Sequence, residues 1–526
     1  MKTNSAARLL SRGTRHTAIV ATAAVAAGLT MWVATSTVQA QETQGSHGAS
    51  QRTDTPDVTA NLFEWNWPSV ARECTDVLGP GGYSGVQVAP PQDSLKRTAL
   101  GDGSTTILHP WWEVYQPVDY GLTSRMGSEA QFASMVATCR KAGVKVYVDA
   151  VINHMTGQGS TSYGGRAYTH FDYPGVYSAT DFHHKGTGAD DCPSASGGIE
   201  DFNNVHQVFK CELLGLADLD TSSPTVQRQL TGYLNKLIGY GVSGFRVDAA
   251  KHVGQSDLDA IYAQLHRTKD GLKPYWALEV FGGGPGILSP QGFTTSGNVL
   301  GLDDVKQIRD AFKSYPAAHV GSLAALEVFG AGSGLTPSAR TLSFVANHDT
   351  ERNGDALSYK DGARYILANE WLLAQGYGHP QVLSGFTWTT ADDSPPSDAN
   401  GMVTDTSCTN GQWTCTDRNA GILGMVGWHN AVGGAPQANF WTDGDNVIAF
   451  SRGNRGWAAF NNNATPQTIT VQTGLPRGSY CDVVHSPAAG GQCSNGLAPV
   501  QVGPDGSATV TVGAYDAVAV DRQNKL

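Results

Sequence analysis

Near the middle of the chain stands Gly244-Phe245-Arg246-Val247-Asp248-Ala249-Ala250-Lys251-His252, an apolar run that carries one arginine and one aspartate two residues apart. The run predicts a strand over 244–248, and side chains two residues apart share one face of a strand. A guanidinium beside a carboxylate favours the ionised form of the acid, which a nucleophile needs. A structural ion pair at a strand end explains the same pattern. The choice between the two interpretations depends on whether other carboxylates lie in the same place.

Strand-like and helix-like segments alternate on both sides of this run. Helical spacing is present over 131–141 and 227–240, and strand-like runs are present over 85–88, 144–153, 275–280 and 341–347. Because parallel strands need long crossover connections, this alternation predicts a parallel sheet with helices on its faces, either open or closed into a barrel.

Two regions break the alternation. Residues 155–217 are rich in Gly, Tyr, Asp and His with little periodicity, which indicates a large insertion after a strand. From about residue 436, short alternating runs separated by Gly and Asn predict a separate antiparallel β domain. The length of 526 residues also favours two or three domains.

The N-terminus has the pattern of a secretory signal. Basic residues precede an apolar, alanine-rich run over 18–33, and Val38-Gln39-Ala40 offers a small-residue cleavage site. An uncleaved membrane anchor is the alternative, and no other apolar run is long enough to span a membrane. We therefore expect a signal peptide over 1–40, a flexible polar leader over 41–57, and a secreted, extracellular mature chain that has no membrane association.

Charge and cysteine content narrow the class of protein further. The formal net charge of −11 argues against nucleic acid or an anionic membrane as a partner. Eight cysteines behind a signal peptide predict disulfides formed in an oxidising compartment. No two of them have the CxxC spacing of a zinc site, and spacing alone leaves their pairing open.

Polar side chains follow several of the predicted strands. Asp149, Asn153 and His154 close the strand at 144–153, and Arg246 and Asp248 close the strand at 244–248. Glu279 closes the strand at 275–280, and His348-Asp349 closes the strand at 341–347. In a parallel α/β barrel the carboxyl ends of all strands lie on one face, which holds the active site. Asp149, Asp248, Glu279 and Asp349 would then meet in one cleft, unless each is a separate structural acid.

Converging carboxylates suit glycoside hydrolysis. One acid must be protonated to donate to the leaving oxygen, and another must be ionised to attack or to activate water. Sequence spacing does not give the separation of the pair, which decides whether configuration is retained. The tryptophans in His109-Pro110-Trp111-Trp112-Glu113-Val114-Tyr115-Gln116 would stack on sugar rings, or else pack in the core.

These motifs together resemble the α-amylases of glycoside hydrolase family 13, in the animal-type group that includes pancreatic amylases and secreted bacterial relatives. The motifs stand in order at 149–154, 244–252, 279 and 344–349. The resemblance implies a (β/α)8 barrel over 58–152 and 219–435, an inserted calcium-binding domain over 153–218 and a C-terminal antiparallel β-sandwich over 436–526. It also implies a monomer that cleaves internal α-1,4-glucosidic bonds of starch, glycogen and maltooligosaccharides with retention, through a covalent glycosyl-enzyme.

The resemblance also implies roles for individual residues. Asp248 matches the nucleophile, Glu279 the acid/base and Asp349 the acid that holds substrate hydroxyls, while Asp149 matches a supporting acid. The implied substrate contacts are Trp111, Trp112, Gln116, His154, Arg246, Lys251, His252 and His348.

Glu279 has a competitor, because Ala-Leu-Glu-Val-Phe-Gly occurs at 277–282 and again at 325–330. Glu279 follows a strand-like Tyr-Trp and precedes three glycines, whereas Glu327 follows a helix-friendly segment. We therefore expect Glu279 to be the acid.

Ion sites and disulfides also follow from the resemblance. Calcium would be held by the side chains of Asn153 and Asp218 and the carbonyls of Phe209 and His252, an all-oxygen set that suits this ion. Chloride, bound in animal-type relatives by two basic residues and an asparagine, should not be required, because the second basic position is the neutral Gln381. The implied disulfides are Cys74–Cys139, Cys192–Cys211, Cys408–Cys415 and Cys481–Cys493.

Two alternative functions stay open at this level. A transglycosylase or an exo-enzyme that releases maltooligosaccharides would use the same three acids. A non-catalytic glucan-binding protein should lack one of them, whereas Asp248, Glu279 and Asp349 are all present.

Overall fold

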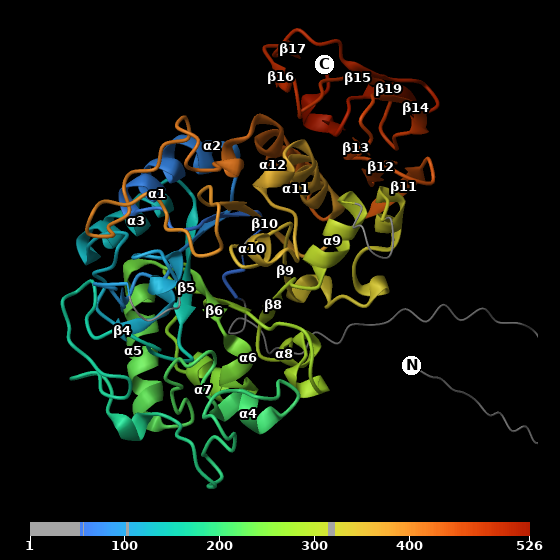
Figure 1. Cartoon of the computed structure of the whole chain (residues 1–526). Coiled ribbons are helices and arrows are strands. Elements are labelled where there is room, and N and C mark those ends of the chain that lie inside the picture. Colours follow the sequence, from blue (N-terminus) through green and yellow to red (C-terminus); the bar gives the residue numbers. More distant parts are fainter. Residues whose placement is uncertain (1–52, 56, 101–104, 314–320) are drawn as a thin grey trace, which may run out of the picture. The chain divides into compact units, whose positions relative to one another are not determined.

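Eight parallel strands close into a barrel in the order β1-β10-β9-β8-β7-β6-β5-β2. Figure 1 labels β5, β6, β8, β9 and β10 among them. The strands of this computed structural model are β1 (Thr59–Leu62), β2 (Gly85–Val88), β5 (Lys145–Val151), β6 (Gly244–Asp248), β7 (Tyr275–Leu278), β8 (Asn298–Leu300), β9 (Thr341–Phe344) and β10 (His379–Ser384). The structure describes residues 53–55, 57–100, 105–313 and 321–526. The signal peptide expected over 1–40 and most of the leader expected over 41–57 lie outside these residues.

The barrel confirms the predicted parallel α/β fold, and the closed form is the correct one. Every residue of β1, β2, β6, β7 and β9 is buried, as expected for parallel strands covered on both faces. The predicted strands at 85–88, 144–153, 244–248, 275–280 and 341–347 correspond to β2, β5, β6, β7 and β9. The register pairs Asp149 on β5 with Arg246 on β6, so the polar ends of these neighbouring strands lie side by side.

Helices follow the strands and cover the barrel, with α3, α5 and α11 outside the strands in Figure 1. They are α1 (Trp67–Glu73), α2 (Gly79–Gly81), α3 (Glu129–Lys141), α5 (Pro224–Tyr240), α6 (Ala250–Val253), α7 (Gln255–Ala263), α8 (Pro290–Phe293), α9 (Asp304–Phe312), α10 (Thr350–Asn353), α11 (Ala363–Gln375) and α12 (Ala420–Val432). The predicted helices at 131–141 and 227–240 are α3 and α5. Helix α5 begins behind the Ser223 cap with Pro224 in its first turn and ends at Gly241, whose φ of 119° suits glycine.

In the long connection between β5 and β6, the segment before α5 contains the short helix α4 (Val205–Lys210), a 3-10 helix at Ala179–Asp181 and otherwise isolated bridges and turns. An antiparallel bridge between His154 and Asp218 brings its two ends together. A second connection, between β2 and α3, carries the paired strands β3 (Asp93–Ser94) and β4 (Pro117–Asp119). These two connections rise from the carboxyl ends of β2 and β5, on the face where the predicted acids lie.

The C-terminal residues form an all-β domain, drawn in orange-red and red in Figure 1. Its strands are β11 (Gln437–Thr442), β12 (Val447–Arg452), β13 (Gly456–Asn461), β14 (Gln467–Gln472), β15 (Gly478–Tyr480), β16 (Ala488–Ala489), β17 (Gln492–Cys493), β18 (Val500–Val502), β19 (Ser507–Val512) and β20 (Asp516–Asp521). A separate apolar core around Trp457 fills it. Trp428 Nε1 on α12 donates to the Val520 carbonyl at 2.9 Å, which ties the domain to the barrel helices.

Four disulfides join the pairs that the resemblance implies, namely Cys74–Cys139, Cys192–Cys211, Cys408–Cys415 and Cys481–Cys493. Within the described part of the chain, the helices are too short or too polar to cross a membrane.

Candidate active site

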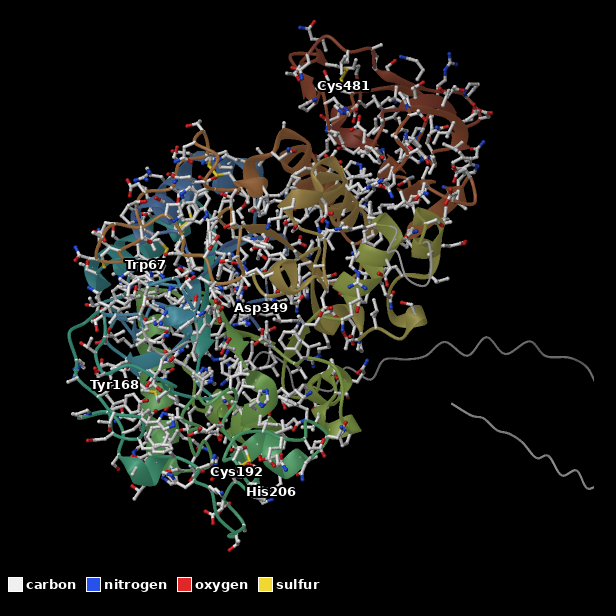
Figure 2. All side chains as sticks on the ribbon, in the orientation of Figure 1. Trp67, Tyr168, Cys192, His206, Asp349 and Cys481 are labelled. Atoms are coloured by element: carbon white, nitrogen blue, oxygen red, sulfur yellow. A yellow bond between two sulfur atoms is a disulfide. The ribbon has the colours of Figure 1, made fainter. Side chains whose placement is uncertain are left out.

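Three acids stand at the carboxyl ends of three barrel strands. Asp248 is the last residue of β6, Glu279 follows β7 directly, and Asp349 follows β9 by five residues. Figure 2 labels Asp349 in the middle of the barrel. Glu327, the competitor of Glu279, lies exposed on a short 3-10 helix away from the strand ends. The barrel topology therefore collects the predicted acids on one face and leaves Glu327 out.

The guanidinium of Arg246 joins three carboxylates. Its Nη1 lies 2.7 Å from Asp149 Oδ1 and 2.7 Å from Asp248 Oδ1, and its Nη2 pairs with Glu279 Oε1. Glu279 Oε2 also accepts from the Ala249 backbone N–H at 3.0 Å. Arg246 is 2 % exposed, so one buried cation holds the nucleophile candidate and the acid candidate together.

Burial dominates the electrostatics of this cluster. It raises the pKa of Asp248 and of Glu279, and it raises the pKa of Asp349 to about 8. The charge of Arg246 opposes the rise at all three, while the charge of Asp248 adds to the rise of the pKa of Glu279. Because one guanidinium cannot neutralise several carboxylates, the cluster keeps a proton near neutral pH, as a general acid requires.

The acids open into a cleft of about 710 Å³. The predicted residues that line it are Trp111, Trp112, Gln116, His154, Asp248, Glu279, His348 and Asp349. A second cavity of about 370 Å³ adjoins it and is lined by Lys251, His252, Glu279 and Phe281 among others. Arg246 was predicted to contact substrate, but it lines neither cavity. It lies beneath the acids and pairs with them instead.

Two neutral histidines border the acids. Burial lowers the pKa of His154 to about 4, and burial together with the Arg246 charge lowers the pKa of His348 well below its usual range. His348 is stacked between Phe63 and Tyr115, with ring centroids 4.5 and 5.2 Å away, and its Nε2 lies 3.3 Å from Asp349 Oδ2. Neutral imidazoles in this position can hydrogen-bond to sugar hydroxyls without adding charge.

Sequence reasoning missed several residues of the cleft, namely Leu213, Leu214, Leu216, Phe281, Arg352 and Asn353. Arg352 follows Asp349 by three residues, and its guanidinium carbon lies 5.0–5.6 Å from the ring centroids of Phe63, Trp111, Phe386 and Trp388. A buried cation packed on rings gains from cation–π attraction. The only sequence signal for Arg352 was its place one helical turn after a predicted acid.

The residues expected to hold calcium come from two connections, with Asn153, Phe209 and Asp218 between β5 and β6 and His252 in the segment after β6. Asn153 and Asp218 are 1 % and 2 % exposed, and Asn153 Nδ2 lies 3.3 Å from Asp218 Oδ1, so rotation of the amide would turn its oxygen to the same point. Phe209 and His252 are in the last turns of α4 and α6, where helical carbonyls lack intrahelical donors. The His252 ring contacts the Val208 carbonyl at 3.1 Å, which brings α4 and α6 together.

Among the described residues, no three His, Cys, Asp or Glu side chains form a metal-binding group. A cation at this place would therefore depend on amide and backbone oxygens beside the single Asp218 carboxylate. Such a mixed oxygen set fits calcium and suits no softer metal.

Gln381 on β10 faces the inside of the barrel. Its Nε2 donates to Gln87 Oε1 at 3.1 Å and to Thr59 Oγ1 at 3.2 Å. It borders a cavity of about 10 Å³ that Arg246 also lines. Gln381 therefore places a neutral amide beside Arg246 at this cavity.

Both the barrel and the C-terminal domain match known protein families. Residues 112–271 match the α-amylase catalytic domain family and residues 440–523 match the family of α-amylase C-terminal all-beta domains. An α-amylase of Thermomonospora curvata is 43 % identical over 473 residues, covering 88 % of this chain and 73 % of that protein. The pancreatic α-amylase of Sus scrofa is 37 % identical over 501 residues, covering 89 % and 94 %.

A solved structure agrees with the observed fold. α-Amylase I of Eisenia fetida, in a mutant crystallised as a complex with maltohexaose, is 37 % identical with a TM-score of 0.81 and covers 90 % of this chain and 99 % of that one. Both domains, the full-length relatives and the acids at the strand ends lead to one conclusion. The chain belongs to the α-amylase family, the starch-hydrolysing glycoside hydrolases of family 13.

Proposed function

We propose that this protein is a secreted, monomeric, retaining α-amylase that cuts internal α-1,4-glucosidic bonds of starch, glycogen and maltooligosaccharides. The observation that carries the proposal is the shared guanidinium, because Asp248 and Glu279 both bind Arg246. One planar group between two carboxylates favours the separation of about 5–5.5 Å found in retaining enzymes over the roughly 6.5–9.5 Å of inverting ones. The disulfides and the signal-like N-terminus support secretion.

The first half of the reaction uses Glu279 as acid and Asp248 as nucleophile. Glu279 is suited to this role, because burial and the charge of Asp248 both raise its pKa and so favour its protonated form. It gives its proton to the leaving glycosidic oxygen while an Asp248 oxygen attacks the anomeric carbon from the opposite face. The products of this step are a shortened glucan and a glucosyl ester of Asp248.

The second half returns the enzyme to its starting state. Glu279, now a carboxylate, removes a proton from a water molecule, which attacks the anomeric carbon and releases Asp248. Asp349 and His348 lie within 3.3 Å of each other at the cleft wall and would hold sugar hydroxyls during both steps. Trp111, Trp112 and His154 would contact the sugar rings on the same side.

The direct test is the configuration and size of the first products. We expect proton NMR to detect the α-anomer of new reducing ends before mutarotation, and chromatography to detect long oligosaccharides early in amylose digestion. Initial β-anomer would contradict retention. Early release of one short product would favour the exo-enzyme, and products longer than the starting maltooligosaccharide would favour a transglycosylase.

We also propose that calcium binds Asn153, Asp218 and the carbonyls of Phe209 and His252. When bound, the ion supplies a purely structural cross-link, since its ligands belong to the β5–β6 connection and to the segment after β6. Asp218 is buried, and burial raises its pKa to about 6, so the ionised form needs a compensating charge.

Removal of calcium should therefore lower the thermal unfolding temperature. A ligand present at 100 times its Kd stabilises the folded state by about 2.7 kcal/mol, and a chelator withdraws that contribution. Differential scanning calorimetry with EGTA, followed by added calcium or magnesium, measures the effect. Calcium alone should restore the original temperature. If EGTA leaves the unfolding temperature unchanged in both wild type and Asp218→Ala, the proposed calcium site is refuted.

Chloride should not be needed for activity. The second basic position of animal-type relatives is the neutral Gln381, which is bonded to Gln87 and Thr59. Dialysis against nitrate or acetate should leave starch hydrolysis unchanged within experimental error. Several-fold activation of the dialysed enzyme by added chloride would contradict this expectation.

A further inference from the structure

A tight turn of the β5–β6 connection projects into the active-site cleft. The Leu216 N–H donates to the Leu213 carbonyl at 3.0 Å, which closes a four-residue turn. Its two central residues, Leu214 and Gly215, have φ values of 55° and 78°. Positive φ at both central positions is the signature of a type I′ turn, where Asn-Gly is the favoured pair. The chain has leucine where the backbone prefers asparagine.

Neither the backbone nor the core explains this leucine. Left-handed φ is unfavourable for a side chain larger than glycine, and asparagine tolerates it best. Five other described non-glycine residues also have positive φ, and of these Glu64, Ala249 and Cys415 are buried. Leu214 is 90 % exposed, so its side chain gains almost nothing from packing in the protein. A residue that departs from local preference without internal compensation indicates a functional contact.

The position of Leu214 identifies the partner of that contact. It lines the 710 Å³ cleft that contains Asp248 and Asp349, and it also lines the adjoining 370 Å³ cavity. The adjoining cavity contains Glu279 without the other two acids. Because the acid protonates the leaving oxygen, this cavity is the side of the leaving glucan. Leu214 therefore stands at the junction of the two sides of the scissile bond.

The turn is anchored on both flanks. The disulfide between Cys192 and Cys211 ends three residues before Leu214, and Glu212 N–H donates to the Gly197 carbonyl at 3.1 Å. On the other flank, Ala217 N–H donates to the Thr156 carbonyl at 3.2 Å. Fixed flanks hold the exposed side chain in place before substrate arrives, which reduces the entropy lost on binding.

We propose that Leu214 is a substrate-binding residue whose side chain packs on the apolar face of the first glucosyl unit on the leaving side. Phe281, 39 % exposed and lining both cavities, forms the facing wall. This contact would favour long glucans over short substrates. The inference rests on the proposed function, because it uses Glu279 as the acid that marks the leaving side.

The test is Leu214→Asn, which improves the turn and removes the apolar contact. We expect an equal or higher unfolding temperature together with about a tenfold lower kcat/KM on maltoheptaose, the usual size of a lost apolar contact. Hydrolysis of a nitrophenyl maltotrioside at its aryl bond, which places no glucose on the leaving side, should change little. Leu497→Asn, at a 51 % exposed leucine of the C-terminal domain, is the control and should keep wild-type kinetics on both substrates.

Two results would overturn the inference. One is unchanged kcat/KM on maltoheptaose in Leu214→Asn. The other is an equal loss on both substrates accompanied by a lower unfolding temperature, since that pattern indicates a structural role. If Leu214→Asn does not fold, Leu214→Gly supplies the same comparison, because glycine accepts the turn without strain. Failure of the proposed function is recognised separately, by an Asp248→Asn variant that keeps wild-type turnover.

Discussion

Asp248→Asn should lower the turnover of soluble starch by at least about 10⁴-fold, the scale on which loss of a nucleophile acts in enzymes with covalent intermediates. The amide has nearly the same shape as the carboxylate and can still accept a hydrogen bond from Arg246 Nη1, which lies 2.7 Å from Oδ1. It cannot form the glucosyl ester. Starch binding and the unfolding temperature should therefore change far less than kcat, as reducing-sugar assays and calorimetry can measure.

Asp149→Asn is the matched control for this variant. Asp149 Oδ1 also lies 2.7 Å from Arg246 Nη1, but Asp149 is 1 % exposed and lines neither cavity. If the loss in Asp248→Asn came only from weakening the bond to Arg246, the two variants would lose similar activity. Wild-type turnover by Asp248→Asn would refute its role outright.

Glu279→Gln should lower kcat/KM on starch by about 10²–10⁴-fold, the range for loss of a general acid. The defect should shrink on a maltooligosaccharide with a nitrophenol leaving group, since that group departs without protonation. Burial raises the pKa of Glu279, so in wild type the acid form is lost as pH rises through that value and kcat/KM on starch should fall with it. The variant should lack this alkaline limb, which a pH profile on both substrates would detect.

Glu327→Gln provides the control, because its local sequence is the same as that of Glu279. Glu327 lies exposed on a 3-10 helix, so full activity is expected. A loss in Glu327→Gln with an unaffected Glu279→Gln would reverse the assignment. An equal defect of Glu279→Gln on both substrates would argue against proton donation.

The sequence predicted β2, β5, β6, β7 and β9 and missed β1, β8 and β10. β5 and β6 are apolar enough to identify alone. β8 is only three residues long, and β10 begins with His379-Pro380-Gln381, so neither has a strand-like pattern until its neighbours pair with it. These strands are buried because the barrel is closed, and a short stretch of sequence does not contain that information.

The residues of the candidate site could likewise be predicted only in part. Acids at strand ends could be predicted, because the barrel places all such ends on one face. The aromatic surroundings of Arg352 could not, since its rings come from segments around residues 63, 111 and 386–388, far apart in the chain. Leu214 was missed for another reason, because an exposed leucine in an irregular insertion has no periodicity to mark it.

The shared contact of Arg246 has a consequence for the energetics of the reaction. In the proposed first step, Asp248 loses a negative charge on becoming an ester, and Glu279 gains one on giving up its proton. The guanidinium binds both groups, so the total charge that it faces is the same before and after the step. The negative charge can thus move from Asp248 to Glu279 without a reorientation of the dipoles of the site. In water, solvent dipoles would have to reorient, at a cost in free energy.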